Sequence, residues 1–496
     1  MSSLPSGWVE SRLADIAEVR LGRQRSPKRA TGDRMRPYLR AANVTWKGID
    51  LTDIKEMDFT AVESESYELR PGDLLLSEAS GSPGEVGKPG QWRGEIEGCC
   101  FQNTLIRVRL PSDLAPDYFE YFFREQALSR RFADGSRGVG IHHLGAAALS
   151  NWLVPLAPVA EQRRIVAAIE EAFSKLDAGE AGLKVVRHRL HRMRHAVLAA
   201  AVSGQLVPQE QADAPAASGS ALEAIRRERW QTWIGRRGSY TDPPEPESEA
   251  PATRLPASWR WVRWCEVGLS QNGRGFPSAE YQDVGVRLLR PGNLAPDGTV
   301  RWPPRNTRHL PVSYRLTHAN LLVGPNELVM NLTAQSLKDD FLGRVSATGE
   351  ADECLLNQRL ARLTPTAMEP RFALVFFRSN LFRNFVSALN TGSLIQHMYT
   401  KQLDQCWVPL PPTGEQQRIV AEVDRQLSFI EAAERAVDAG MARSAALRRS
   451  ILKAAFDGRL VPQDPSDEPA SILLERIRSE RTASPTPKRR RARATA

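Results

Sequence analysis

The chain contains two copies of one long segment, about 254 residues apart in a sequence of 496 residues. The clearest match joins Glu161-Gln-Arg-Arg-Ile-Val166 to Glu415-Gln-Gln-Arg-Ile-Val420, and a Val-Pro-Leu run precedes each. Further matches are Leu4-Pro-Ser-Gly-Trp8 with Leu255-Pro-Ala-Ser-Trp259, Cys100-Phe-Gln-Asn103 with Cys354-Leu-Leu-Asn357, and Gly204-Gln-Leu-Val-Pro-Gln209 with Gly458-Arg-Leu-Val-Pro-Gln463. Because each copy is as long as one or two domains, the repeat predicts two copies of one fold.

The first part of each copy, residues 1–156 and 255–411, has the pattern of a mixed α/β domain. Short apolar runs such as Asp73-Leu-Leu-Leu76 and Leu105-Ile-Arg-Val-Arg-Leu110 are separated by Gly, Pro and Asn, which predicts strands joined by turns. A helix is expected around residues 116–132, with its counterpart at 370–389. Residues 209–254 between the copies are expected to form a linker with one short helix.

The second part of each copy, residues 157–208 and 412–463, is expected to be a long helix. In the first copy the helix should run from about Glu161 to Ser203, and Gly204 then ends it. Apolar or small residues recur at alternating spacings of four and three, which is a heptad stripe. Such a narrow stripe must be buried against a partner, and the stripe of the other copy is the obvious one. The two stripes are Ile165, Ile169, Ala172, Leu176, Gly179, Leu183, Val186, Leu190, Met193, Val197 and Ala200, and Ile419, Val423, Gln426, Ile430, Ala433, Val437, Gly440, Ser444, Leu447, Ile451 and Ala454.

Composition narrows the class of protein. No apolar run approaches the roughly 20 residues that cross a bilayer, and the N-terminal residues lack a secretory pattern, so a cytoplasmic location is expected. The five cysteines suggest buried apolar positions rather than disulfides or a metal site. The net charge is +9, but residues 481–496 supply six basic side chains and no acidic one. In residues 1–47, 10 basic side chains face 4 acidic ones, which allows a local basic surface. The C-terminal segment 464–496 is expected to end in a disordered basic tail.

The sequence offers no recognisable catalytic machinery. The stretch from Ser82 to Pro89 lacks the first glycine and the metal-binding hydroxyl of a phosphate-binding loop. His188, His191 and His195 have helical spacing, but arginines surround them, which favours a solvated helix face over a metal site. We therefore expect a binding protein that is not an enzyme, with no catalytic residue, cofactor or metal of its own.

The paired modules resemble the specificity subunit (HsdS) of type I restriction-modification enzymes over residues 4 to about 463. The resemblance rests on the repeated Val-Pro-Leu run, the Glu-Gln-x-x-Ile-Val helix start and the closing Gly-x-Leu-Val-Pro-Gln. It implies two target recognition domains, joined by two long antiparallel helices as a coiled-coil spacer with pseudo-two-fold symmetry. It further implies partners: double-stranded DNA, two modification subunits that methylate adenine at N6, and restriction subunits when present. S-adenosylmethionine, ATP and Mg would belong to those partners.

Candidate DNA-binding residues were chosen because they occupy matching positions in the two copies. Arg, Lys, Asn, Gln, Ser and Thr are the side chains that contact phosphates and base edges. The alternative reading is that Arg40 and Asn43 cap a turn and that Ser82 only breaks a loop. The candidates are Arg40, Asn43, Lys47, Ser80, Ser82, Lys88, Ser136, Arg137 and His143 in the first copy, and Arg290, Asn293, Arg301, Gln335, Ser336, Lys338, Ser393, Gln396 and His397 in the second.

Two other functions remain open at this stage. A protein-interaction scaffold without DNA is compatible with the near-neutral first domain, where residues 1–156 carry 20 basic and 21 acidic side chains. A fused methyltransferase would need an Asn-Pro-Pro-aromatic segment and a glycine-rich cofactor loop, and neither is present in recognisable form.

Overall fold

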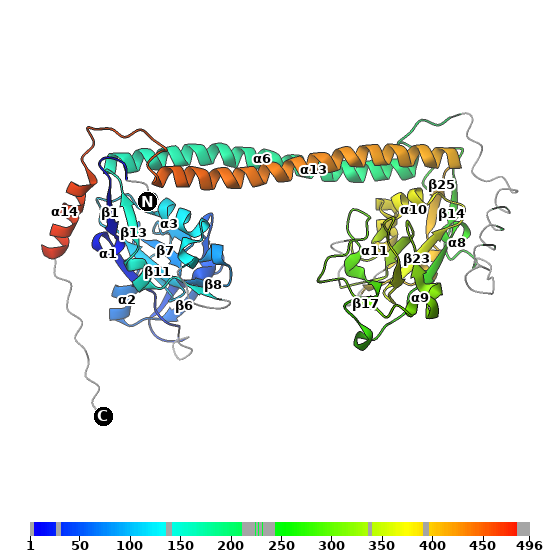
Figure 1. Cartoon of the computed structure of the whole chain (residues 1–496), viewed down its shortest axis with the longest axis horizontal. Helices are drawn as coiled ribbons and strands as arrows, with labels where there is room; N and C mark the ends of the chain where they lie inside the picture. The colour runs from blue at the N-terminus through cyan, green and yellow to red at the C-terminus, as the bar shows by residue number, and fades with distance from the viewer. Residues whose placement is uncertain are drawn as a thin grey trace, which may run out of the picture. The chain divides into compact units, whose positions relative to one another are not determined.

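The computed structural model describes residues 4–25, 31–134, 141–210, 224, 227, 231, 244–335, 340–389 and 396–483. The chain divides into two compact units. Unit 1 comprises residues 1–184 and 438–496, and unit 2 comprises residues 185–437. Figure 1 labels the helices and strands of both units. Among the described residues, no helix is both long and apolar enough to cross a membrane.

Unit 1 is built on a four-stranded sheet in the order β2-β11-β7-β9 and a three-stranded sheet in the order β10-β3-β6. The strands of these sheets are β2 (Glu18–Leu21), β11 (Leu105–Arg109), β7 (Leu74–Ser77), β9 (Pro89–Gln91), β10 (Cys100–Phe101), β3 (Met35–Leu39) and β6 (Lys55–Asp58). Three strand pairs complete the unit: β1 (Val9–Arg12) with β13 (Leu153–Leu156), β8 (Ala79–Ser80) with β12 (His142–His143), and β4 (Val44–Thr45) with β5 (Gly48–Ile49). Its short helices are α1 (Leu13–Ile16), α2 (Ala61–Tyr67), α3 (Pro116–Leu128), α4 (Arg131–Asp134) and α5 (Ala146–Ser150).

Unit 2 follows the same plan. Its two sheets have the orders β15-β23-β19-β21 and β17-β16-β22-β18. The strands are β15 (Gly268–Asn272), β23 (Leu360–Pro365), β19 (Leu328–Asn331), β21 (Val345–Ala347), β17 (His309–Leu310), β16 (Val286–Leu289), β22 (Cys354–Leu356) and β18 (Leu322–Val323), and the pairs β14 (Arg260–Arg263) with β25 (Trp407–Leu410) and β20 (Thr333–Ala334) with β24 (Gln396–His397). Its short helices are α8 (Trp264–Val267), α9 (Tyr314–Thr317), α10 (Pro370–Phe377), α11 (Asn380–Leu389) and α12 (Thr400–Asp404).

Strand β7 shows why this architecture follows from the sequence. Its leucines are all buried, and they alternate between two apolar clusters, as strand geometry requires. Leu74 and Leu76 join the cluster that contains the aromatic face of α3, whereas Leu75 joins the cluster beneath the three-stranded sheet. A strand covered on both faces has to be continuously apolar, which explains the Leu-Leu-Leu run that predicted it.

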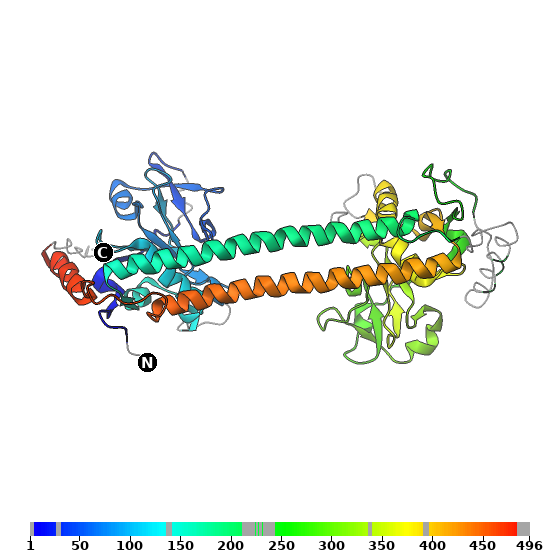
Figure 2. The ribbon, with the colours of Figure 1, turned by 90° about the horizontal axis from the view of Figure 1, so that it is seen from above.

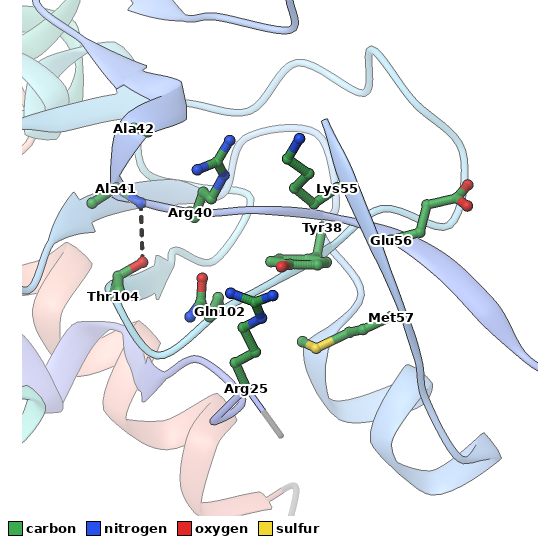
Figure 3. Close-up of a pocket in the computed structure, with 10 residues that line it drawn as sticks. All are labelled: Arg25, Tyr38, Arg40, Ala41, Ala42, Lys55, Glu56, Met57, Gln102 and Thr104. Atoms are coloured by element: carbon green, nitrogen blue, oxygen red, sulfur yellow. Dashed lines mark hydrogen bonds between the residues drawn. The ribbon is translucent and has the colours of Figure 1, made fainter. Parts of the chain in front are cut away.

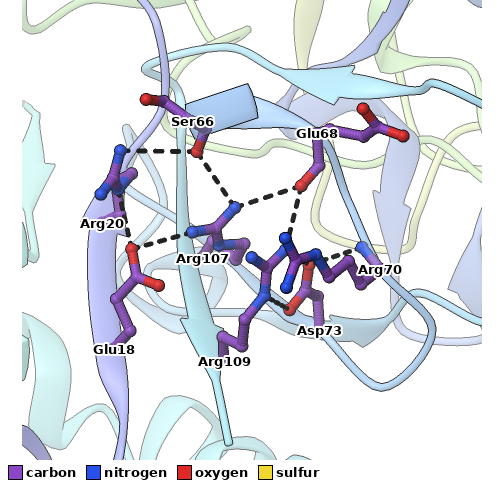
Figure 4. A network of polar contacts seen from close by, with 8 residues as sticks. All are labelled: Glu18, Arg20, Ser66, Glu68, Arg70, Asp73, Arg107 and Arg109. Atoms are coloured by element: carbon purple, nitrogen blue, oxygen red, sulfur yellow. Dashed lines mark hydrogen bonds and ion pairs between the residues drawn. The ribbon is translucent and has the colours of Figure 1, made fainter. Parts of the chain in front are cut away.

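A buried arginine crosses each four-stranded sheet at the same register. Arg107 on β11 pairs with Leu75, and Arg362 on β23 pairs with Val329. Arg107 donates to the carbonyl oxygens of Ser66 and Glu68, each at 3.2 Å (Figure 4). Arg362 likewise donates to the carbonyl oxygens of Asn320, in the 3-10 turn before β18, and of Leu322, the first residue of β18. In both units the arginine therefore holds the segment that passes across the sheet.

Charged neighbours complete this network in unit 1. Arg109 binds both carboxylate oxygens of the buried Asp73, at 2.7 and 2.6 Å (Figure 4). Burial lowers the pKa of Arg107 to about 10, and the nearby Arg109 acts in the same direction. Burial alone would raise the pKa of Glu18, but Arg107 and Arg20 lower it below its usual value. These ion pairs and hydrogen bonds thus connect β2, β11 and Asp73, which directly precedes β7, to the segment that contains Ser66 and Glu68.

Two long helices carry the predicted heptad stripes. Helix α6 spans Val159–Ser203 and α13 spans Thr413–Phe456, so the expected length of the first helix is confirmed to within two residues. In unit 1 the two helices run antiparallel, because Glu180 accepts a hydrogen bond from Ser444 and Asp177 pairs with Arg448 (Figure 2). In unit 2, Arg194 of α6 forms ion pairs with Glu431 and Glu434 of α13.

Burial along the stripes is strongest toward the helix ends. Ile165 and Ile169 of α6 join Leu452 and Phe456 of α13 in the main core of unit 1. The prediction of a continuous buried stripe is wrong in three places, because Gly179, Val186 and Met193 are exposed. Leu447 of the second stripe is exposed as well. A glycine is needed at position 440 of the second stripe, because a Cβ there would lie 2.9 Å from the Leu183 side chain.

The repeated Glu-Gln and Pro-Gln motifs meet each other across the repeat. In unit 1, Gln463 donates to the buried Glu161, which also accepts a 2.9 Å hydrogen bond from Trp8. In unit 2, Gln209 donates to the buried Glu415. In each unit, the glutamate of one copy is therefore hydrogen-bonded to the glutamine of the other copy, which explains why both motifs occur twice.

The structure corrects three details of the sequence interpretation. The helix expected at 116–132 is two helices, α3 and α4, and its counterpart at 370–389 is α10 and α11. The C-terminal segment contains helix α14 (Ala470–Ala483), whose Leu473, Leu474 and Ile477 lie in the main core of unit 1. Cys100 does not correspond to Cys354, because Cys100 pairs with Tyr38 while Leu355 pairs with the matching Leu288. The expected basic tail lies outside the described residues.

Candidate nucleic-acid interface

The predicted residues Arg40 and Asn43 in unit 1, and Arg290 and Asn293 in unit 2, belong to a tight turn that is the same in both units. Arg40 lies between the end of strand β3 and the 3-10 turn Ala41–Asn43, and Arg290 lies between the end of strand β16 and the turn Pro291–Asn293. The Asn43 side chain accepts a hydrogen bond from the Arg40 amide, and its amide group donates to the carbonyl oxygens of Asp50 and Asp53. Asn293 makes the same bond to the amide of Arg290.

This geometry favours the turn-capping role for Asn43 and Asn293. Both are buried, with exposed fractions of 3% and 1%. Their amide groups satisfy buried backbone atoms, so using them to read a base would leave those backbone atoms unpaired. The turn instead presents its flanking residues: Arg40 and Arg290 before it, and the exposed Lys47 at the tip of the β4–β5 hairpin.

Four further candidates, Ser80, His143, Gln396 and His397, lie on a pair of short antiparallel strands in their unit, which we call the ribbon. In unit 1, Ser80 on β8 lies opposite His142 on β12, and His143 lies opposite Ala79. In unit 2, Gln396 lies opposite Ala334, and His397 lies opposite Thr333. Residues about 60 apart in the sequence thus share one short strand pair, on which His143 and His397 are exposed and hold the same register in both units.

Several predicted basic side chains are already paired within the protein. Lys88 forms an ion pair with Glu85 and lies over the Trp46 ring, with its amine 6.0 Å from the ring centroid. Arg301 pairs with Asp297, and Arg40 pairs with Asp53. His143 lies 3.1 Å from Glu78. Exposed ion pairs of this kind contribute little to stability, so Arg301 and His143 remain able to exchange partners.

The remaining candidates are placed only in part. Gln335 is exposed and directly follows β20. Ser82 follows Ser80, whose hydroxyl accepts a hydrogen bond from the Ser82 amide. Ser136, Arg137, Ser336, Lys338 and Ser393 lie outside the described residues.

A basic pocket in unit 1 was not predicted from the sequence. It lies on the face of β3 and β6, and Figure 3 shows Arg25, Tyr38, Arg40, Lys55 and Gln102 around it. Lys55 reaches it because β6 pairs with β3, so that Lys55 lies opposite Tyr38. The surplus of basic residues in positions 1–47 was the available sequence signal, but only the strand pairing brings these side chains together.

The described residues hold no cluster of three or more His, Cys, Asp or Glu side chains that would bind a metal ion. The five cysteines are free and buried, as predicted, and burial raises the pKa of Cys99 and Cys100 to about 12. On α6, His188 and His191 are exposed, and His195 lies 3.1 Å from the Asn380 side chain. The histidines therefore lie on a helix surface, which agrees with the interpretation made from their spacing.

Comparison with known proteins shows what this chain is similar to. Residues 5–184 match the family model described as the type I restriction modification DNA specificity domain. The EcoKI specificity subunit of Escherichia coli (strain K12) is 26% identical over 97% of this chain and 97% of its own length. The StySPI specificity subunit of Salmonella potsdam is 24% identical with the same coverage of both chains. A chain from a solved type I restriction-modification system has the same fold, with a TM-score of 0.59, 19% identity, and coverage of 92% of this chain and 100% of that one.

These similarities span the repeated motifs, the α/β units and both long helices. Residues 5–184 therefore match the DNA specificity domain of type I restriction modification, and nearly the whole chain is similar to specificity subunits of type I restriction enzymes.

Proposed function

We propose that the two units are target recognition domains that read the two halves of one bipartite, asymmetric DNA site. The observation that carries this proposal is the repetition of one fold with different side chains on its exposed turns. On the short strand pair that both units share, Ser80 and His142 of unit 1 stand where unit 2 has Ala334 and Gln396. Two frameworks of one kind with different surface residues are suited to reading two different short sequences.

The residues we assign to DNA are the exposed or exchangeable ones. Phosphate contacts need Lys and Arg, and base edges need side chains with paired donors and acceptors. Arg290 forms no ion pair with another described residue, and Gln396 lies on the ribbon beside His397. We keep the undescribed loop candidates in the proposal and remove Asn43 and Asn293, whose amides cap turns, and Lys88, whose amine is paired with Glu85. The assigned residues are Arg40, Lys47, Ser80, Ser82, His143, Arg290, Arg301, Gln335, Gln396 and His397.

The long helices are proposed to act as the spacer between the two half-sites. Reading two half-sites from one face of a duplex requires readers about one helical turn, roughly 34 Å, apart or a multiple of it. Paired helices meet this need because their length is fixed by about 1.5 Å per residue. The ion pairs of Arg448 in unit 1 and of Arg194 in unit 2 support a paired arrangement of α6 and α13.

Two modification subunits are the proposed protein partners, with restriction subunits joining when present. The modification subunits would bind S-adenosylmethionine and methylate one adenine at N6 in each half-site. The restriction subunits would use ATP and Mg. The described part of this chain contributes specificity and position rather than chemistry.

The proposal is tested by a mobility-shift assay with the purified chain and its modification subunit. We expect retention of a duplex that carries the recognised sequence, and weaker retention of a scrambled duplex of equal length. Equal retention of both duplexes, or retention of neither, would favour the alternative, a protein-interaction scaffold that does not read DNA.

The spacer proposal has its own test. Inserting seven residues into the middle of both helices lengthens each by about 10 Å, which is close to three base pairs along the duplex. We expect the unspecified spacer of the recognised site to lengthen by about three base pairs while both half-sites stay the same. An unchanged spacer would contradict the proposed role of the helices.

A further inference from the structure

The basic pocket of unit 1 is a formed cavity of about 430 Å³. Its walls come from the loop after β2, from β3 and β6, and from the turn after β10 (Figure 3). Arg25, Arg40 and Lys55 bring three cationic groups to it. Glu56 also belongs to the lining, but Figure 3 shows its carboxylate directed away from the others.

The charges around the pocket suit a ligand with one negative charge. Asp53 pairs with Arg40 and, at 2.7 Å, with Lys55. With Glu56 included, two carboxylates oppose three cations, which leaves a net charge of +1. Arg25 forms no ion pair with another described residue, so its guanidinium is the cation available to a ligand.

One buried donor in the pocket lacks an acceptor within the described part of the chain. The Nε atom of Arg40 is buried and has no hydrogen-bond partner. The Tyr38 side chain also lines the cavity, and no hydrogen bond to its hydroxyl is present among the described residues. Buried donors without partners are rare in folded proteins, and here Arg40 Nε indicates a site for a ligand with hydrogen-bond acceptors. The side chain of Gln102 adds a further donor beside them (Figure 3).

Unit 2 keeps two of the three cationic positions. Arg290 matches Arg40, and Arg308 lies opposite Leu288 as Lys55 lies opposite Tyr38. The positions of Tyr38 and Arg25 differ, because strand pairing matches Tyr38 with Leu288 and the order of residues after Arg23 and Arg274 matches Arg25 with Phe276. Phe276 and Leu288 belong to one apolar cluster with Val286, Leu310 and Leu355, so unit 2 has apolar side chains where unit 1 has a guanidinium and a phenol hydroxyl.

We propose that this pocket binds one phosphodiester group of the DNA in the half-site read by unit 1. The inference rests on the proposed function. An anion surrounded by two guanidiniums, an amine and a phenol hydroxyl matches a phosphate, whose oxygens accept hydrogen bonds from all sides. A base edge would also present donors, and the pocket offers them few acceptors. A free nucleotide or inorganic phosphate has the same chemistry, and the experiment separates these sources from DNA.

The test compares Arg25→Gln with Arg93→Gln, which removes the same charge from an exposed side chain of unit 1 outside the pocket. Each variant is assembled with the modification subunit, and its affinity for duplexes is measured at several salt concentrations. We expect Arg25→Gln to weaken binding about tenfold on every sequence. The slope of log affinity against log salt should fall by about 1, as for the loss of one phosphate contact. Arg93→Gln should match the wild type.

A second measurement locates the contact. Duplexes with a single neutral methylphosphonate at each successive position are bound to the wild type and to Arg25→Gln. We expect one position in the first half-site to weaken the wild type about tenfold and to have no further effect on the variant. Tyr38→Phe, which removes only the hydroxyl, should show a smaller loss at the same position.

The proposal is overturned by three results. Wild-type affinity and salt slope in Arg25→Gln would remove the phosphate contact. A changed preference among bases, rather than a uniform loss, would assign the pocket to base reading. Saturable binding of inorganic phosphate or adenosine monophosphate that Arg25→Gln abolishes, with unchanged DNA affinity, would assign it to a free ligand. If the wild type bound all duplexes equally and Arg25→Gln still lost tenfold, the proposed function would fail while the DNA-phosphate site would stand.

Discussion

The two units share a framework but differ in what they place on one sheet. Both have a four-stranded sheet of the same connection order, a buried arginine at the same register, and an asparagine that caps the same turn. On the second sheet, unit 1 has Tyr38 and Lys55 beside a basic cavity, whereas unit 2 has Leu288 and Phe276 in an apolar cluster. The framework is repeated because folding requires it, and the surface that faces a ligand is the part that varies.

A second difference concerns how each core is closed. In unit 1, α14 places Leu474 and Ile477 in the same cluster as Trp8 and the aromatic residues of α3. The amide of Ala470 also donates to the carbonyl oxygen of Gly7 at 2.9 Å. The last helix of the chain is thus part of the first domain.

The largest effect is expected from shortening a side chain of α14. Ile477 is 1% exposed, so Ile477→Ala should lower the free energy of unfolding of unit 1 by about 2–5 kcal/mol. Hydrogen exchange measured peptide by peptide would show faster exchange in unit 1 only. Ile472→Ala on the exposed face of the same helix is the matched control and should change stability by no more than about 0.5 kcal/mol. Equal acceleration in both units would show that they do not unfold separately.

The buried arginines provide the next comparison. Arg107→Met removes one donor from each of the carbonyl oxygens of Ser66 and Glu68, which keep only Arg20 and Arg109 as donors, and should cost unit 1 about 1–3 kcal/mol. Arg362→Met should cost unit 2 a similar amount, since Arg362 donates to two carbonyl oxygens there. Urea unfolding with exchange readout in each unit measures both. A loss in one unit only would mean that the repeated register does not carry a repeated role.

A change in the proposed reading residues should affect one half-site. Arg290→Ala is expected to relax discrimination at one base of the second half-site by about 1–3 kcal/mol and to leave the first half-site unchanged. His143→Ala is the corresponding change in unit 1. Competition binding against duplexes with single base substitutions measures both variants. Equal relaxation of the two half-sites by either variant would argue against independent readers.

The smallest effect is a pH dependence confined to unit 1. Burial raises the pKa of Glu125 on α3, although Arg131 acts in the opposite direction, and the matching position in unit 2 is Ser379. A carboxyl whose folded pKa is raised favours the folded state at low pH, and this contribution is lost as pH rises through that pKa. Glu125→Gln should therefore stabilise unit 1 relative to wild type at pH 7, and the difference should disappear near pH 4. Thermal unfolding at both pH values would reveal it, and a difference that grows toward pH 4 would reverse the assigned cause.

The repeat made most of the fold predictable. Leu74 to Leu76 and the heptad stripes gave strands and long helices, because continuous apolar runs and a narrow stripe have few ways to be buried. The exposed Val186 and Met193 were not predictable, since a stripe only needs a partner where the helices approach closely. The core role of α14 was missed because its apolar residues join a core whose other residues come mostly from the first 173 residues of the chain, with α1 more than 450 residues earlier in the sequence.

The candidate interface was predictable only as a set of turns. Matching positions located the turns after β3 and β16 and the ribbons with His143 and His397, but not which atoms are already bonded. Asn43 and Asn293 occupy matching positions because they cap a turn that both copies need. Such a structural requirement produces the same match between the copies as a shared DNA contact would. The pocket was missed because Arg25, Tyr38, Lys55 and Gln102 meet only through strand pairing.

The central claim is that two similar units read two separate halves of one DNA site. Mapping methylated adenines across the genome of a host that carries this chain with its modification subunit tests that claim most directly. We predict two short, different sequences separated by a constant number of unspecified base pairs, with one methylated adenine in each. A single continuous recognition sequence, or methylated adenines with no constant spacing between two halves, would contradict it.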